Sequence, residues 1–169
     1  MAQSVRGWCR RWTGAGVGLM LLCCAVFLPG VWSIPPIDRD EARFAQASRQ
    51  MWESGDFVVP RVQDRPRLNK PPLVYWLQCG AIAVFGDAPG QWAHGNIWVF
   101  RVPGVLCAIA SVLLTWRIGL RMMDPRAAAL GAALLAVCPL VAWDAHQARA
   151  DQLLLLTVVW TQLALWLCW

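Results

Sequence analysis

The ionisable residues of this chain are concentrated in one short segment, residues 38–70. Six of the ten carboxylates lie there, and the segment ends with Lys70, the only lysine beside fourteen arginines. The adjacent carboxylates Asp40 and Glu41 have the chemistry of a general base, a ligand for a divalent cation or an anchor for a cationic substrate. Lys70 precedes two prolines, which restrict it to an extended conformation, and its compact ammonium suits a phosphate.

Each of these candidates also has a purely structural interpretation. Carboxylates in the first turn of a helix complement its free N–H groups and its dipole, which applies to Asp40, Glu41 and Asp151 alike. Lys70 can instead extend toward lipid headgroups, as basic side chains near helix ends commonly do. Spacing alone therefore leaves both interpretations open.

Composition places the chain among membrane proteins. It is 58% hydrophobic and only 15% charged, with a mean hydropathy of +0.45 and twelve tryptophans; soluble domains are typically about 25% charged. The formal charge of +5 is scattered between apolar runs and forms no basic stripe, which excludes a nucleic-acid partner.

Cysteine and histidine spacing gives no metal site. The seven cysteines include no CxxC pair and mostly lie in apolar runs, as small buried hydrophobic residues do. His94 and His146 lack ligand-spaced partners and are interpreted as polar loop residues. A divalent metal at the carboxylates remains chemically reasonable, but no clear ligand set is present, so the cofactor is unknown.

Four apolar runs predict membrane spans, because about 20 residues cross a hydrocarbon core of about 30 Å. Arginines before the first run, and Arg117, Arg121 and Arg126 between the second and third, predict that these connections and the N-terminus are cytoplasmic. The first run is interpreted as an uncleaved anchor rather than a signal peptide, because no small-residue cleavage site follows it. The spans are predicted at residues 13–34, 101–120, 127–146 and 151–169.

The outer loop, residues 35–100, is predicted to contain two helices. Residues 40–54 have amphipathic periodicity, with Asp38 as an N-cap and Gly55 as a stop signal. Residues 73–85 would form a helix of only about 20 Å, too short to span, so an interfacial or re-entrant helix is expected. The predicted fold is all-α and integral to the membrane, with about four transmembrane helices and in-plane outer-loop helices that place Asp40 and Asp151 at the outer surface.

Several blocks in order resemble the first outer loop of the aminoarabinose transferases, polyprenyl-phosphate-dependent membrane glycosyltransferases related to the protein mannosyltransferases and of the GT-C fold. They are Asp40-Glu41-Ala42-Arg43-Phe44-Ala45, Ser48-Arg49-Gln50-Met51, Ser54-Gly55-Asp56-Phe57-Val58-Val59-Pro60 and Lys70-Pro71-Pro72-Leu73-Val74-Tyr75-Trp76, and Ala148-Arg149-Ala150-Asp151 resembles the family's second acidic site.

The resemblance implies an inverting enzyme of the bacterial inner membrane. It would move a sugar from a polyprenyl-phosphate donor to a lipid, protein or glycan acceptor on the outer face. Asp40 would be the catalytic carboxylate, Asp151 the second acidic residue of the site, and Lys70 the ligand of the lipid phosphate. Glu41, Arg43 and Arg149 would be supporting residues for substrate binding.

Two departures from the family bear on this hypothesis. Asn69 stands where aminoarabinose transferases often have a glutamate associated with metal binding, which argues against a zinc-type site and against aminoarabinose or lipid A as substrates. Family members are also much longer, and the last run stops at Trp169 without a basic flank, so we expect an N-terminal portion of a longer transferase. The alternative is a non-enzymatic membrane module that binds lipid phosphate or a partner chain; a transporter fits less well, because the spans lack interior polar residues.

Overall fold

The computed structural model describes residues 2–86 and 97–168, with side chains from residue 14 onward. The cationic N-terminal side chains, Asp87 to Gly90, His94 and Trp169, on which parts of the sequence interpretation rest, lie outside this described part. The elements within it are α1 (Ala2–Phe27), α2 (Arg39–Ser54), β1 (Arg61–Val62), β2 (Arg65–Pro66), α3 (Leu73–Phe85), α4 (Ile97–Met122), α5 (Pro125–Ala136), α6 (Pro139–Ala145) and α7 (Asp151–Cys168).

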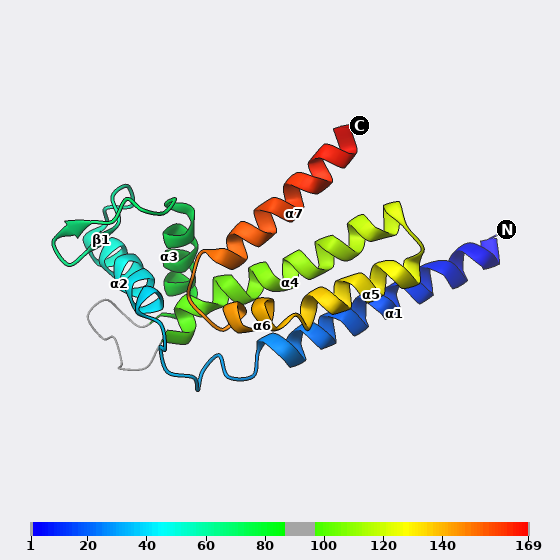
Figure 1. The fold of residues 1–169 in the computed structure, drawn as a ribbon, viewed down its shortest axis with the longest axis horizontal. Coiled ribbons are helices and arrows are strands. Elements are labelled where there is room, and N and C mark those ends of the chain that lie inside the picture. The colour runs from blue at the N-terminus through cyan, green and yellow to red at the C-terminus, as the bar shows by residue number, and fades with distance from the viewer. Residues whose placement is uncertain (1, 87–96, 169) are drawn as a thin grey trace.

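The long helices form an elongated bundle around α4 (Figure 1). Helices α1, α5 and α7 all pack against α4, and α3 contacts it as well. The main core between α1, α4 and α5 combines small and branched side chains with aromatic ones, and Phe27, Val112 and Ala132 are fully buried in it. The two chain ends and the α4–α5 connection lie at one end of the bundle, and α2, α3 and the strands lie at the other.

Within the described residues, two helices are long and apolar enough to cross a membrane. They are α4, with 26 residues, and α7, with 18. Helices α5 and α6 form a third span if they are counted as one, but they meet at an angle of 55°. Pro139 explains this break in the run predicted at 127–146, because proline cannot donate the helical hydrogen bond and disfavours a helical conformation at Cys138, whose ψ is 122°.

The first predicted span, residues 13–34, is helical only as far as Phe27. The helix ends at Phe27 rather than Ile34, and its described apolar part, Gly14–Phe27, is shorter than a span. Pro29 and Gly30 follow at once, and Gly30 has a φ of +91°, a conformation that only glycine adopts without strain. Residues after Phe27 instead form turns, with the backbone N–H of Ile34 donating to Gly30 O.

The two helices of the outer segment occupy the residues that the sequence predicted. Asp38 caps α2 by accepting a hydrogen bond from Asp40 N at 3.1 Å, and Gly55 ends it with a φ of +71°. Helix α3 follows the two prolines and packs its buried face on α2, where the rings of Phe44 and Tyr75 stack at 5.6 Å. Whether α3 lies at the membrane surface remains a prediction.

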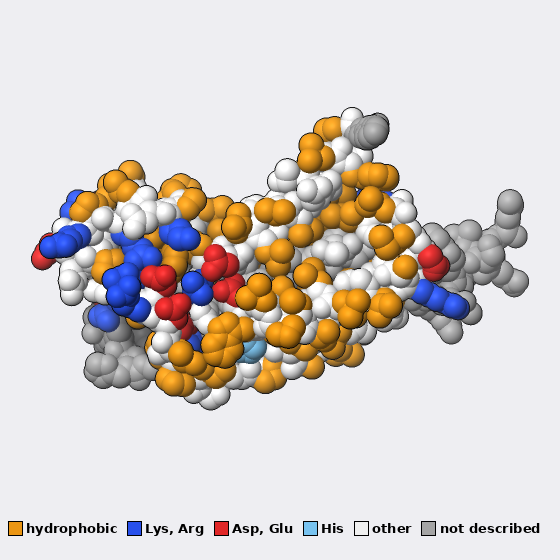
Figure 2. Space-filling view, in the orientation of Figure 1, with side chains coloured by type: hydrophobic (Ala, Val, Ile, Leu, Met, Phe, Trp, Pro, Cys, Tyr) orange, Lys and Arg blue, Asp and Glu red, His pale blue; other side chains and the backbone are white. Residues whose placement is uncertain are grey.

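A short β-hairpin, β1 with β2, was not predicted. Its turn contains Gln63, with a φ of +57°, and the side chain of Gln50 on α2 bonds both the N–H and the C=O of that residue. The hairpin therefore contacts α2, and in the described part of the chain this ladder is the only regular secondary structure besides the helices. Figure 2 shows charged side chains gathered at this end of the molecule, while hydrophobic side chains cover the face of the long helices.

Candidate functional site

Asp40 lies in the first turn of α2 with its side chain 45% exposed. Two arginines approach the same carboxylate oxygen, Arg43 Nη1 at 3.6 Å and Arg67 Nη2 at 3.9 Å. The exposure leaves the carboxylate open to a substrate. The arrangement is that of an accessible carboxylate held in place by flanking cations.

Arg67 is fixed from beneath. Its guanidinium lies over the ring of Phe44, 4.9 Å from the centroid, and its Nε donates to the hydroxyl of Tyr75 at 3.2 Å. These contacts, with Phe44 on α2 and Tyr75 on α3, hold the Arg67 guanidinium near Asp40, with Nη2 3.9 Å from the carboxylate.

Arg149 joins the two acidic segments. Its guanidinium lies 3.5 Å from Asp38 and 3.6 Å from Asp151, and a third carboxylate, Asp144, lies at 4.0 Å. Asp151 is the first residue of α7 and its side chain is 49% exposed. The structure thus brings the second acidic site beside the start of α2, more than a hundred residues earlier in the chain.

Glu41 is placed differently from its expected role as a supporting substrate-binding residue. Its side chain is only 1% exposed and pairs with Arg101, also 1% exposed, through Nε at 2.7 Å and Nη2 at 3.2 Å. The same carboxylate accepts from Ala148 N at 3.1 Å. Glu41 therefore lies beneath the surface, because its position on α2 faces α4 rather than solvent.

Sequence reasoning missed Arg101, which it used only as the start of a span. Besides Glu41, its Nη1 donates to Val31 O and Ile34 O, both at 2.8 Å. The available signal was a single arginine surrounded by the apolar residues of α4, since a charge in such a place is costly unless it is paired.

Lys70 is exposed, in a bend that follows the hairpin and precedes α3. Among the described residues no carboxylate lies within ion-pair distance of it. An ammonium that is not neutralised by the protein is suited to an external anion.

No metal centre is formed by the described part of the chain, where no group of three His, Cys, Asp or Glu side chains has a suitable arrangement. His146, interpreted as a polar loop residue, lies between two carbonyl oxygens, with Nδ1 2.6 Å from Ala142 O and Nε2 2.7 Å from Pro29 O. It therefore links the end of α6 to the turn that follows α1.

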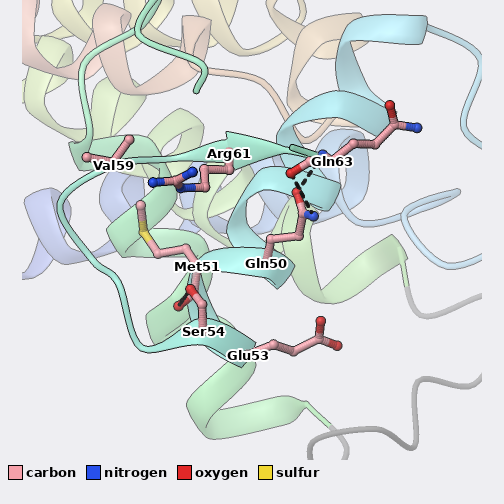
Figure 3. Close-up of a pocket in the computed structure, with 7 residues that line it drawn as sticks. All are labelled: Gln50, Met51, Glu53, Ser54, Val59, Arg61 and Gln63. Atoms are coloured by element: carbon pink, nitrogen blue, oxygen red, sulfur yellow. Dashed lines mark hydrogen bonds between the residues drawn. The ribbon is translucent and has the colours of Figure 1, made fainter. Parts of the chain in front are cut away.

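A hollow of about 320 Å³ lies between the C-terminal half of α2 and the hairpin (Figure 3). Its walls include Gln50, Glu53 and Arg61, with Met51 and Val59 between them. Glu53 is near the last turn of α2 and Asp40 is in the first, so roughly 20 Å of helix separates them. This hollow is consequently distinct from the site formed by Asp38, Asp40 and Asp151, here called the acidic site.

Comparison with known proteins places the chain in a family. Residues 69–169 match the model of the dolichyl-phosphate-mannose-protein mannosyltransferases. The chain belongs to this family. With its apolar helices, it is an integral membrane protein whose fold is consistent with the all-α GT-C architecture. No solved structure matches it.

Curated relatives extend the similarity to the segment that contains Asp40. An undecaprenyl phosphate-α-4-amino-4-deoxy-L-arabinose arabinosyl transferase 2 of Pseudomonas fluorescens is 36% identical over 81% of this chain, and the corresponding transferase of Erwinia tasmaniensis is 32% identical over 76%. That of Pseudomonas savastanoi is 33% identical over 83%. The chain spans only 21–24% of the length of these three relatives.

Proposed function

We propose that the natural protein containing this chain transfers a sugar from a polyprenyl-phosphate carrier to an acceptor on the outer face of the bacterial inner membrane. The observation that carries this proposal is the position of Arg149 between Asp38 and Asp151, at 3.5 and 3.6 Å, which joins the two acidic segments in one site. Asp40 lies two residues from Asp38 and is exposed beside this junction.

Asp40 is the general base of the proposed reaction. It takes the proton of the acceptor hydroxyl or amine while that atom attacks the anomeric carbon of the sugar. The bond between this carbon and the phosphate oxygen breaks, and its electron pair leaves with the polyprenyl phosphate. Attack from the side opposite the leaving group inverts the anomeric configuration.

The basic residues have separate tasks in this scheme. Lys70 binds the lipid phosphate and stabilises the negative charge that develops as it leaves. Arg43 orients Asp40, to which it lies at 3.6 Å. Asp151 and Arg149 form the facing wall of the site and contact the substrate from there. Glu41 acts only indirectly, because it is buried.

The names of the relatives support an undecaprenyl-phosphate-linked sugar as the donor. The steps proposed above are assigned to side chains of this chain. Asn69, in the place where aminoarabinose transferases often have a glutamate, leaves the identity of the sugar open to the assay below.

The proposed sidedness is supported by the two arginines that flank the short α4–α5 connection. Arg121 and Arg126 flank the α4–α5 connection, at the end of the bundle where both chain ends lie (Figure 1). Because positive loops remain in the cytoplasm, this end faces inward and the acidic site faces the periplasm.

The test is a transfer assay with the full-length natural protein in its own membranes or in detergent, using synthetic undecaprenyl-phosphate sugars and envelope extracts as acceptors. Asp40→Asn is expected to lower kcat by about 10²- to 10⁴-fold, the usual contribution of a general base. Asp64→Asn is the matched control, because Asp64 is also an exposed aspartate of the outer segment but lies in the hairpin turn.

Full activity of Asp40→Asn would refute the catalytic role. Absence of turnover in the wild-type protein with any carrier sugar, together with stable purification in complex with a second membrane chain, would instead support the alternative of a non-enzymatic membrane module.

A further inference from the structure

Beneath the acidic site lies a buried group of polar side chains that the reaction scheme does not use. It consists of Glu41 on α2, Gln78 on α3 and Arg101 on α4, here called the clamp, and all three are about 1% exposed or less. We propose that the clamp is a positioning device, which sets Arg149 and Asp151 relative to Asp40 by holding the peptide group of Ala148. The proposal rests on the proposed function.

Ala148 is held at both of its polar backbone atoms. Its N–H donates to Glu41 Oε1 at 3.1 Å, and its carbonyl accepts from Gln78 Nε2 at 3.4 Å. Residues 146–150 form no regular helix, so these side chains supply partners that secondary structure does not. Ala148 itself is 1% exposed. Its position is therefore dictated by α2 and α3, the two helices of the outer segment.

The side chains that hold Ala148 are themselves fixed. Gln78 accepts from Ser48 Oγ at 2.5 Å and also donates to Phe100 O at 3.4 Å, which connects α2, α3 and α4. Glu41 is fixed by two hydrogen bonds from Arg101. Bidentate guanidinium–carboxylate pairs of this kind fix the orientation of the two groups as well as their distance.

Arg101 extends the clamp to the turn that leads into α2. Its Nη1 donates to Val31 O and Ile34 O, both at 2.8 Å. The start of α2, which carries Asp38 and Asp40, is thereby tied to the same guanidinium as Glu41. One buried arginine thus sets both the segment before Asp40 and, through Glu41, the segment before Arg149.

A displacement of Ala148 moves the residues that follow it. Arg149 is the next residue, and its guanidinium bridges Asp38 and Asp151. Catalytic geometry is sensitive to such movement, since a misplacement of about 1 Å can reduce the rate about 10²-fold. The clamp touches no solvent and so reaches no substrate, which makes its members positioning residues rather than catalytic ones.

The variant that isolates this role is Gln78→Met. Methionine has a similar shape, so the substitution removes the hydrogen bonds to Ala148, Ser48 and Phe100 without leaving an unpaired buried charge. Ser111→Ala is the matched control, because Ser111 is a fully buried polar residue of α4 whose hydroxyl bonds only Cys107 O of its own helix.

Two measurements are made on the full-length natural protein: amide hydrogen exchange of the segment around Ala148, and kcat and KM for the carrier sugar. Gln78→Met is expected to increase exchange at this segment and to lower kcat about 10- to 100-fold, with the KM for the donor nearly unchanged. Ser111→Ala should change neither quantity. A purely structural role of Gln78 would lower the amount of folded Gln78→Met protein and leave kcat per folded molecule at the wild-type value.

Faster exchange with unchanged kcat, or lower kcat with unchanged exchange, would each overturn the positioning role while the proposed transfer reaction stands. If the wild-type protein transfers no sugar, the exchange measurement still decides whether Gln78 holds Ala148. In that case the proposed function fails and only the structural clamp remains.

Discussion

Removing one partner of the buried Glu41–Arg101 pair should be far more damaging than removing both. Arg101→Met leaves the Glu41 carboxylate buried without its cation, a situation that costs about 3–5 kcal/mol. The double variant Glu41→Leu with Arg101→Met removes both charges from an environment in which each is 1% exposed. Replacement of a buried pair by apolar residues is often nearly neutral, so the double variant should recover much of this loss.

The recovery should be incomplete for a reason visible in the structure. Arg101 also donates to Val31 O and Ile34 O, and Glu41 also accepts from Ala148 N, so two buried backbone groups and the part-buried Ile34 carbonyl lose a partner in the double variant. Each unsatisfied buried group costs about 1–3 kcal/mol, less where it finds water or a relaxed partner. We therefore expect the double variant to remain about 1–3 kcal/mol less stable than wild type.

The measurement is a double-mutant cycle from denaturant unfolding of the full-length protein in mixed micelles, with Ser111→Ala as a buried control on the same helix. The expected coupling energy between Glu41 and Arg101 is at least about 3 kcal/mol, because the two single losses of about 3–5 kcal/mol each exceed the loss of about 1–3 kcal/mol in the double variant. Additive effects of the two substitutions would refute the reasoning, since they would mean that the charges do not sense one another.

Two further predictions concern the segments around the site. Gly30→Ala should destabilise the protein by about 1–3 kcal/mol, because a Cβ at a φ of +91° is strained and would lie 2.7 Å from the Ile34 side chain. The same unfolding assay measures this loss, with Gly18→Ala as the control, because a Cβ at Gly18 would meet no atom within 4 Å. Equal stability of the two variants would contradict the prediction. The backbone N–H groups of Val58 and Val59 hold the pKa of Asp56 below its ordinary value of 3.8. The contribution of this carboxylate to folding stability is therefore complete above the unfolded-state pKa and is lost as the pH falls through the lower folded-state pKa. In an NMR titration these amide signals should shift only in that acidic range, and Asp56→Asn should abolish the shift.

The sequence was sufficient for elements whose signals are local. Helix α2 is marked by a capping aspartate at one end and a glycine at the other, and α3 by two prolines before it and Gly86 after it, so both were predicted to within a residue. The end of α1 was missed because hydropathy continues to Ile34 although the helix does not. Pro29 and Gly30 were the available signal, but an apolar run alone cannot distinguish a helix from an apolar turn.

The interior of the site could not be predicted because its contacts are distant in sequence. Glu41 and Arg101 are 60 residues apart, and Glu41 and Ala148 are 107 apart, so no local pattern reports either contact. The meeting of Asp38, Arg149 and Asp151 depends in turn on how α7 follows α6. What the sequence did contain was the chemistry of each group, without the geometry that decides which group is exposed.

The adjacent carboxylates Asp40 and Glu41 show how that geometry divides chemical roles. Successive residues of an α-helix are rotated by about 100°, so two neighbours cannot both face the same partner. On α2 this rotation directs Asp40 to the surface, where its side chain is 45% exposed, and Glu41 into the interior, where 1% is exposed. An acid–acid pair in the sequence is therefore not a two-carboxylate centre in the fold: the exposed member is available for proton transfer, and the buried member holds Ala148 and Arg101, and through them the other wall of the site.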